Sequence, residues 1–167
     1  TYLNGFFQQW LPKLTKHIRA IAQGAVDVSK FETSVSQLGI RCVEVLRYMS
    51  ANGDAPSDVG FHTDSDSVYT MVFMLAQPHH DFSGGAFQMQ ASSTTLDNLE
   101  IGHGFLFDSE KAHRVLTVQE GVRTVLVLEF WRFADATKDE FRPEPEDGRP
   151  FRRDSQNSRR KKKRLDL

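Results

Sequence analysis

The chain has 167 residues, of which 39% are hydrophobic and 11% aromatic, which is enough for one hydrophobic core and too little for two. Its single cysteine excludes an internal disulfide, and no apolar run approaches the roughly twenty residues that span a bilayer. The net charge of −1 conceals an acidic body, with 12 basic and 20 acidic residues up to Gly148, and a basic end with 9 basic and 2 acidic residues.

The first predicted element is an amphipathic helix over residues 1–22. Its apolar residues recur at intervals of three and four, with lysines and His17 largely between them: Leu3, Phe7, Trp10, Leu11, Leu14, Ile18 and Ile21. Pro12 falls inside this pattern, so we expect it to bend the helix or to begin it anew.

From residue 40 onward the pattern changes to short β-rich runs separated by turns. The runs cover residues 40–49, 68–75, 86–90, 105–107, 115–118 and 122–131. Turn residues cluster at 51–57 and at Ser83-Gly84-Gly85, where the two glycines permit a tight reversal. Repeated short strands without helices between them predict a mainly β fold, either a sandwich or a jelly-roll barrel.

The residues His62, Asp64 and His113 indicate a metal site. Residues i and i+2 of a strand project from the same face, so we expect His62 and Asp64 to grip one ion together. About fifty residues separate them from His113, enough for several strands that fold the second histidine back over the first. Two imidazoles and one carboxylate suit ferrous iron and leave positions open for a chelating co-substrate and oxygen, whereas structural zinc more often uses thiolates.

Arg123 lies in the β-rich run 122–131, where it shares one face with Val125 and Val127. A cation among apolar neighbours is costly to bury unless an anion pairs with it. Its flat guanidinium can bind a carboxylate through two parallel hydrogen bonds. The distal carboxylate of 2-oxoglutarate is a natural partner for this side chain.

Six motifs occur in the order that one enzyme family shows: Val45-Leu46-Arg47-Tyr48, Gly60-Phe61-His62-Thr63-Asp64, Phe82-Ser83-Gly84-Gly85-Ala86-Phe87, Gly104-Phe105-Leu106-Phe107, Ala112-His113-Arg114-Val115 and Gly121-Val122-Arg123. Through them, residues 40–131 resemble the 2-oxoglutarate- and Fe(II)-dependent dioxygenases, and within these the prolyl 4-hydroxylase-like branch. The resemblance implies a double-stranded β-helix, or jelly roll, with the N-terminal helix as a support on the outer face of the large sheet.

The resemblance also implies roles for individual residues. His62, Asp64 and His113 would be the iron ligands and the catalytic centre, Arg123 would anchor the co-substrate, and Tyr48 would give it a phenol hydrogen bond. The chain departs from the family in two respects. The family often has lysine at the anchoring position, and some relatives have a serine where Val125 stands. An arginine at this position therefore does not identify the substrate. Tyr48 becomes the second residue that is expected to anchor the co-substrate.

The activity that the resemblance implies is hydroxylation of a peptidyl side chain, proline first, coupled to decarboxylation of 2-oxoglutarate to succinate. It would require Fe(II) and O2, with ascorbate as an optional further cofactor. The partner would be a peptide or protein, with a small molecule as the alternative. Two rival classes stay open: a cupin-like metal enzyme that does not use 2-oxoglutarate and would not need Arg123, and a non-catalytic interaction module with the same fold.

Residues 1–135 form the predicted dioxygenase domain, with the supporting helix at 1–22 and the jelly-roll core at 40–131. Residues 136–167 form a polar linker and a basic tail, and we expect the tail to be disordered in isolation. The tail fits a nuclear localisation signal, a weak nucleic-acid contact or solvated charge.

Ferrous iron and a lone cysteine favour a reducing, intracellular setting, cytoplasmic or nuclear. Because the chain starts at Thr1, we expect an upstream segment to be missing.

Overall fold

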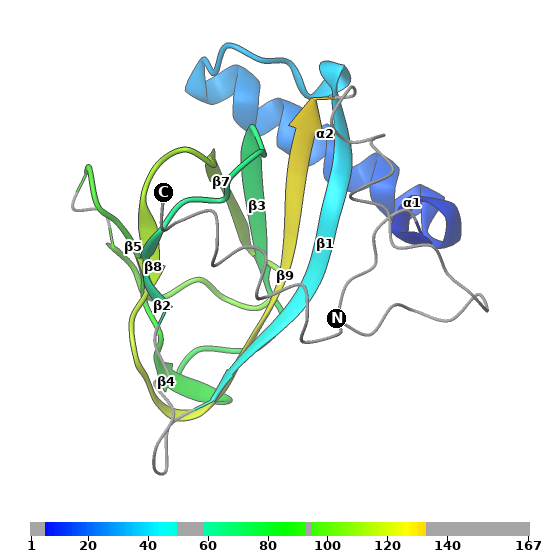
Figure 1. The fold of residues 1–167 in the computed structure, drawn as a ribbon. Coiled ribbons are helices and arrows are strands. Elements are labelled where there is room, and N and C mark those ends of the chain that lie inside the picture. The colour runs from blue at the N-terminus through cyan, green and yellow to red at the C-terminus, as the bar shows by residue number, and fades with distance from the viewer. Residues whose placement is uncertain (1–5, 50–58, 93–94, 133–167) are drawn as a thin grey trace, which may run out of the picture.

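The computed structural model describes residues 6–49, 59–92 and 95–132, which build two helices and two antiparallel sheets (Figure 1). The helices are α1 (Phe6–Trp10) and α2 (Pro12–Ser29), followed by a single 3-10 turn, η1 (Val35–Gln37). The strands of the described residues are β1 (Leu38–Met49), β2 (Val59–His62), β3 (Tyr69–Met74), β4 (Phe82–Gly84), β5 (Phe87–Met89), β6 (Thr95–Leu96), β7 (Gly104–Asp108), β8 (His113–Val115) and β9 (Val118–Arg132).

The two sheets form the layers of a jelly roll. The large sheet has the order β1-β9-β3-β7, with β4 also pairing to β9, and the small sheet has the order β2-β8-β5-β6. The β1–β9 ladder runs from Leu38 opposite Arg132 to Met49 opposite Val122. In Figure 1 the small sheet lies on one side of the large sheet and the helices lie on the other. This arrangement confirms the predicted mainly β fold with a supporting N-terminal helix.

Helix α2 packs on the outer face of the large sheet. Its buried residues follow one another at three- and four-residue intervals: Thr15, Ile18, Ala22 and Val26. The last three join one core cluster with Leu128 and Phe130 of β9, while Val125 of the same strand belongs to a second cluster between the sheets. Because side chains alternate along a strand, β9 contributes to both clusters, as the predicted alternation requires.

The helical segment differs from the prediction in its extent. Pro12 is the first residue of α2, and Leu11 before it has a non-helical backbone with φ −126° and ψ 54°. Proline therefore begins the helix anew, because its fixed φ and missing N–H suit a first turn. The helix continues to Ser29 rather than ending near residue 22, and Lys30 closes it in the left-handed conformation with φ 57°.

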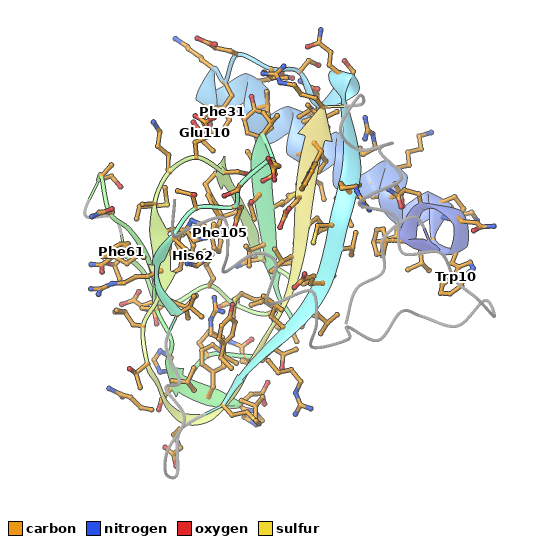
Figure 2. The ribbon with its side chains drawn as sticks, in the orientation of Figure 1. Trp10, Phe31, Phe61, His62, Phe105 and Glu110 are labelled. Atoms are coloured by element: carbon orange, nitrogen blue, oxygen red, sulfur yellow. The ribbon has the colours of Figure 1, made fainter. Side chains whose placement is uncertain are left out.

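The predicted apolar face of the helix is only partly buried. Phe7 and Ile18 are in the core, whereas the other described members are 43–53% exposed: Trp10, Leu11, Leu14 and Ile21. Figure 2 shows Trp10 pointing away from the sheets. The break at Leu11 divides one expected helix into two, so a single periodic face cannot run through both. Leu3 lies outside the described residues.

Four predicted runs agree with β1, β3, β5 and β7 to within two residues. The short strands β2, β4 and β6 are not among the predicted runs, and β4 includes Ser83 and Gly84, for which the sequence predicts a turn. The sequence predicts separate runs at 115–118 and 122–131, but β9 is continuous from Val118 to Arg132. Gly121, with φ +74°, lies at the point where β4 pairs alongside, and a Cβ there would meet the carbonyl oxygen of Asp81. The predicted turn at 51–57, the domain end near residue 135 and the tail at 136–167 lie outside the described residues.

Within the described ranges, no helix combines the length and the apolarity that a bilayer crossing needs.

Candidate functional site

The side chains of His62, Asp64 and His113 converge at the small sheet, where one ligand atom from each lies within 4.8 Å of the others. His62 is the last residue of β2 (Figure 2), His113 is the first residue of β8, and the two stand opposite each other in the ladder. Asp64 lies in the loop after β2 rather than in the strand. The expectation that one strand carries both residues is therefore wrong, because β2 ends at His62, although the two side chains do lie together in the cluster.

Backbone carbonyl groups orient both imidazole rings. Nδ1 of His62 lies 2.8 Å from the carbonyl oxygen of Gly60, and Nδ1 of His113 lies 3.0 Å from that of Lys111. A carbonyl oxygen only accepts, so each Nδ1 carries the proton and donates, and each Nε2 of a neutral ring keeps its lone pair. The donors that could bind a metal ion are therefore the two Nε2 atoms.

Both Nε2 atoms face the carboxylate of Asp64. His62 Nε2 lies 3.9 Å from Oδ1, and His113 Nε2 lies 3.7 Å from Oδ2. The His62 side chain is 40% exposed, whereas that of His113 is 6% exposed. The cluster thus has a closed side at His113 and an open side at His62.

Aromatic rings enclose His113. The ring of Phe87 stacks on it at 5.3 Å between centroids, and Phe107 meets it edge-on at 4.5 Å. Loss of hydration on burial lowers the pKa of His113 below its ordinary value, although the Lys111 carbonyl and the charge of Asp64 act in the opposite direction. The environment therefore favours the neutral imidazole, which is the form that binds metal ions.

Two buried polar residues that belong to none of the sequence motifs lie beside Asp64. The hydroxyl of Thr70 donates to Asp64 Oδ2 at 2.5 Å, and Ser109 Oγ lies 2.9 Å from Thr70 Oγ1. A threonine inside the otherwise apolar run of β3 is the only signal in the sequence that points to this contact, because a buried hydroxyl needs a polar partner.

Arg123 is buried on β9, opposite Tyr48 of β1, and its guanidinium carbon lies 5.2 Å from the centre of the Tyr48 ring. The residue is 3% exposed, and among the described residues no carboxylate lies within ion-pair distance of it. Burial lowers the pKa of Arg123 and raises the pKa of the Tyr48 phenol. The positive charge of Arg123 acts against the rise in the pKa of Tyr48, whereas the negative charges of Glu44 and Asp64 add to it.

A small cavity adjoins Arg123. Besides this residue it is lined by Met74, Pro78, Phe82, Gly85, Leu96, Asp97 and Leu99. None of His62, Asp64 and His113 lines it. Gly85 has φ +66°, and a Cβ there would lie 2.8 Å from Arg123 Cδ, so the missing side chain leaves room for the arginine.

No protein-family model and no curated protein matches the chain. Among solved structures, it is similar to a viral collagen prolyl hydroxylase from Paramecium Bursaria Chlorella virus-1, with 16% identity, TM-score 0.57 and coverage of 78% of this chain and 76% of that one. A prolyl 4-hydroxylase from Phytophthora capsici matches with 16% identity, TM-score 0.50 and coverage of 86% and 50%.

A 2OG-Fe(II) oxygenase family oxidoreductase from Burkholderia pseudomallei matches with 24% identity, TM-score 0.48 and coverage of 57% of this chain and 45% of that one. The chain thus spans about half the length of the bacterial and the Phytophthora proteins. At these identities the similarity concerns the fold. The chain has the fold of the prolyl hydroxylases among the 2-oxoglutarate- and Fe(II)-dependent oxygenases, as the resemblance in its sequence predicts.

Proposed function

We propose that the chain is a 2-oxoglutarate- and Fe(II)-dependent dioxygenase that hydroxylates a peptidyl side chain, proline first, and couples this reaction to decarboxylation of 2-oxoglutarate to succinate. The observation that carries the proposal is the convergence of two imidazole nitrogens and one carboxylate, from distant parts of the chain, within 4.8 Å. The fold shared with a viral collagen prolyl hydroxylase supports the same reaction class.

The donors present fit ferrous iron. His62 and His113 offer neutral imidazole nitrogens, Asp64 offers a carboxylate, and three protein donors leave coordination positions for a co-substrate and O2. When bound, iron with 2-oxoglutarate would supply the oxidising chemistry that consumes O2, releases succinate and carbon dioxide and hydroxylates a C–H bond. Ascorbate would serve as an optional reductant.

Arg123 is proposed to bind the distal carboxylate of 2-oxoglutarate. A buried guanidinium without a carboxylate partner among the described residues favours an anionic ligand, because an uncompensated buried charge is costly. The raised pKa of Tyr48 keeps its phenol protonated, so it can donate to the same ligand. Phe82, Leu96 and Leu99 offer apolar contacts along the cavity wall. These side chains would position the co-substrate and exclude water from it.

The substrate is proposed to be a peptide because two of the similar structures, with TM-scores of 0.57 and 0.50, are a collagen prolyl hydroxylase and a prolyl 4-hydroxylase. The open side of the cluster, at His62, is where such a peptide would approach. The direct test measures succinate release across a library of proline-containing peptides, with mass detection of one added oxygen.

Variants of the cluster separate the proposed function from its rivals. His62→Ala should abolish succinate release and peptide oxygenation, while His103→Ala, at an exposed histidine outside the cluster, should keep both. Anaerobic titration of the wild type with Fe(II) and 2-oxoglutarate should give a weak visible charge-transfer band that His62→Ala lacks. Oxygenation without 2-oxoglutarate would favour a cupin-like enzyme, and a wild type without the band would favour an interaction module.

A further inference from the structure

We infer that Thr70 and Ser109 are positioning residues that hold the Asp64 carboxylate ready for the metal ion. The inference rests on the proposed function, since it assigns these two residues to the same site. Thr70 is 1% exposed and Ser109 is fully buried at 0%. Their hydroxyl groups form a continuous chain to the carboxylate, with 2.9 Å between Ser109 Oγ and Thr70 Oγ1 and 2.5 Å between Thr70 Oγ1 and Asp64 Oδ2.

The direction of this hydrogen-bond chain follows from the number of protons. An ionised carboxylate only accepts, so the single hydroxyl proton of Thr70 is used in the bond to Asp64. Thr70 can then only accept from Ser109, which makes Ser109 the donor in their contact. Both donors point toward Asp64, and aligned hydrogen bonds in a buried setting strengthen one another.

The position of Asp64 in the fold explains why it needs this support. His62 and His113 are held by the ladder between β2 and β8, whereas Asp64 lies in the loop that leads from the small sheet to the large one. Thr70 belongs to β3, and Ser109 directly follows β7, its neighbour in the large sheet. The two hydroxyl groups therefore tie the loop carboxylate to the large sheet.

Backbone contacts reinforce the same connection. The N–H of Asp64 donates to the carbonyl oxygen of Ser109 at 3.0 Å, and the N–H of Ser109 donates to that of Val68 at 3.1 Å. The hydroxyl of Ser67 also donates to the carbonyl oxygen of Asp64 at 2.9 Å. With the loop backbone fixed in this way, the Thr70 hydroxyl determines how the carboxylate is turned toward the two Nε2 atoms. Groups that hold a metal ligand in this manner typically change metal affinity about 10- to 100-fold when they are removed.

The test measures Mn(II) binding to the metal-free full chain by electron paramagnetic resonance of the free ion, which requires no turnover. Thr70→Val removes the hydroxyl and keeps the shape, and it should raise the Kd for Mn(II) at least about 10-fold. Thr70→Ser keeps the hydroxyl and should restore a Kd close to that of the wild type. Ser109→Ala, which removes the outer donor, should give a smaller rise than Thr70→Val.

Thr15→Val is the matched control, because Thr15 is a buried threonine on α2 whose hydroxyl has no hydrogen-bond partner among the described residues. This variant should bind Mn(II) as the wild type does. Thermal unfolding of each metal-free variant, followed by circular dichroism, separates metal affinity from folding. If Thr70→Val is unfolded, the Kd of Ser109→Ala for Mn(II) tests the inference in its place.

The outcomes distinguish this inference from the proposed function. A wild type that binds no Mn(II) would overturn the proposed function, and the inference with it. A wild type that binds, together with an unchanged Kd in folded Thr70→Val or in Ser109→Ala, would overturn the inference alone. Equal losses of Mn(II) affinity in Thr70→Ser and Thr70→Val would also overturn it, because Thr70→Ser keeps the hydroxyl group and the loss could then not be assigned to that group.

Discussion

Tyr48 and Arg123 stand opposite each other in the β1–β9 ladder, and the guanidinium carbon lies 5.2 Å from the centre of the phenol ring. A cation–π contact of this kind contributes about 0.5–2 kcal/mol. Withdrawing a charged group from water costs several kcal/mol, so the ring offsets only part of the cost of burying Arg123. The large sheet thus carries a buried positive charge that an anionic ligand would neutralise.

Arg123→Ala should raise the KM for 2-oxoglutarate about 100-fold, or about 2.7 kcal/mol, because it removes one partner of a buried charge pair. Arg123→Lys keeps the charge but loses the planar fork, so we expect a rise of about 10-fold. Succinate release at increasing 2-oxoglutarate concentration measures both. Arg47→Ala, at an exposed arginine next to Tyr48, is the control and should leave KM unchanged. If Arg123→Ala keeps the wild-type KM for 2-oxoglutarate, Arg123 does not bind the co-substrate.

Arg123→Met should stabilise the ligand-free protein while it raises the KM for 2-oxoglutarate as Arg123→Ala does. Methionine fills a similar volume without a charge, and replacing buried ionic groups by apolar side chains of similar volume is often neutral or stabilising by about 1–4 kcal/mol. Urea unfolding of the wild type and the variant, both without ligands, measures the difference. A variant less stable than the wild type would mean that the guanidinium is already neutralised in the ligand-free protein.

Gly85→Ala should disturb both the fold and the arginine. Its φ of +66° costs a residue with a Cβ about 1–2 kcal/mol, and that Cβ would lie 2.8 Å from Arg123 Cδ. We therefore expect lower stability in urea and a higher KM for 2-oxoglutarate.

Gly24→Ala is the control for this substitution, because Gly24 is exposed on α2 and has nothing within 4 Å of an added Cβ. It should gain about 0.5–1 kcal/mol from helix propensity without a change in KM. If Gly85→Ala also keeps the wild-type KM, the arginine does not depend on the space beside that glycine.

The fold was predictable wherever a local pattern determines it. Alternation along 122–131 predicts which side chains of β9 share a face, and the two core clusters agree with it. The exposed faces of the helices were not predictable, because Pro12 starts a new helix and the small residue Ala22, rather than Ile21, faces the sheet. The spacing of apolar residues alone does not reveal such a change in which helix residues face the sheet.

The candidate site was predictable where chemistry restricts the residue types. His62, Asp64 and His113 stand out because few side chains bind metal ions, and the structure brings them together. Thr70 and Ser109 do not stand out, because their partner depends on how β3, β7 and the loop at Asp64 approach one another. The place of Asp64 outside β2 has the same kind of cause, since its backbone N–H binds the carbonyl oxygen of Ser109, a contact that no repeating pattern predicts.

The buried position of His113 predicts that the metal-free protein loses stability in mild acid. Burial lowers the pKa of this imidazole, while in the unfolded chain the ring titrates near its ordinary pKa of about 6.5. Below about pH 6.5 the unfolded state therefore takes up a proton more readily than the folded state. The contribution of His113 to the free energy of unfolding is complete above that pH and is lost as the pH falls through the lowered pKa.

Urea unfolding in the presence of a chelator, at about pH 7.5 and about pH 5.5, should show this loss in the wild type. His113→Phe can pack among the same aromatic rings but cannot titrate, so its free energy of unfolding should fall less between the two pH values. His17→Gln changes an exposed histidine of α2, and its free energy of unfolding should fall between the two pH values as much as that of the wild type. Equal falls in His113→Phe and the wild type would contradict the prediction, because the acid sensitivity would then arise from other groups.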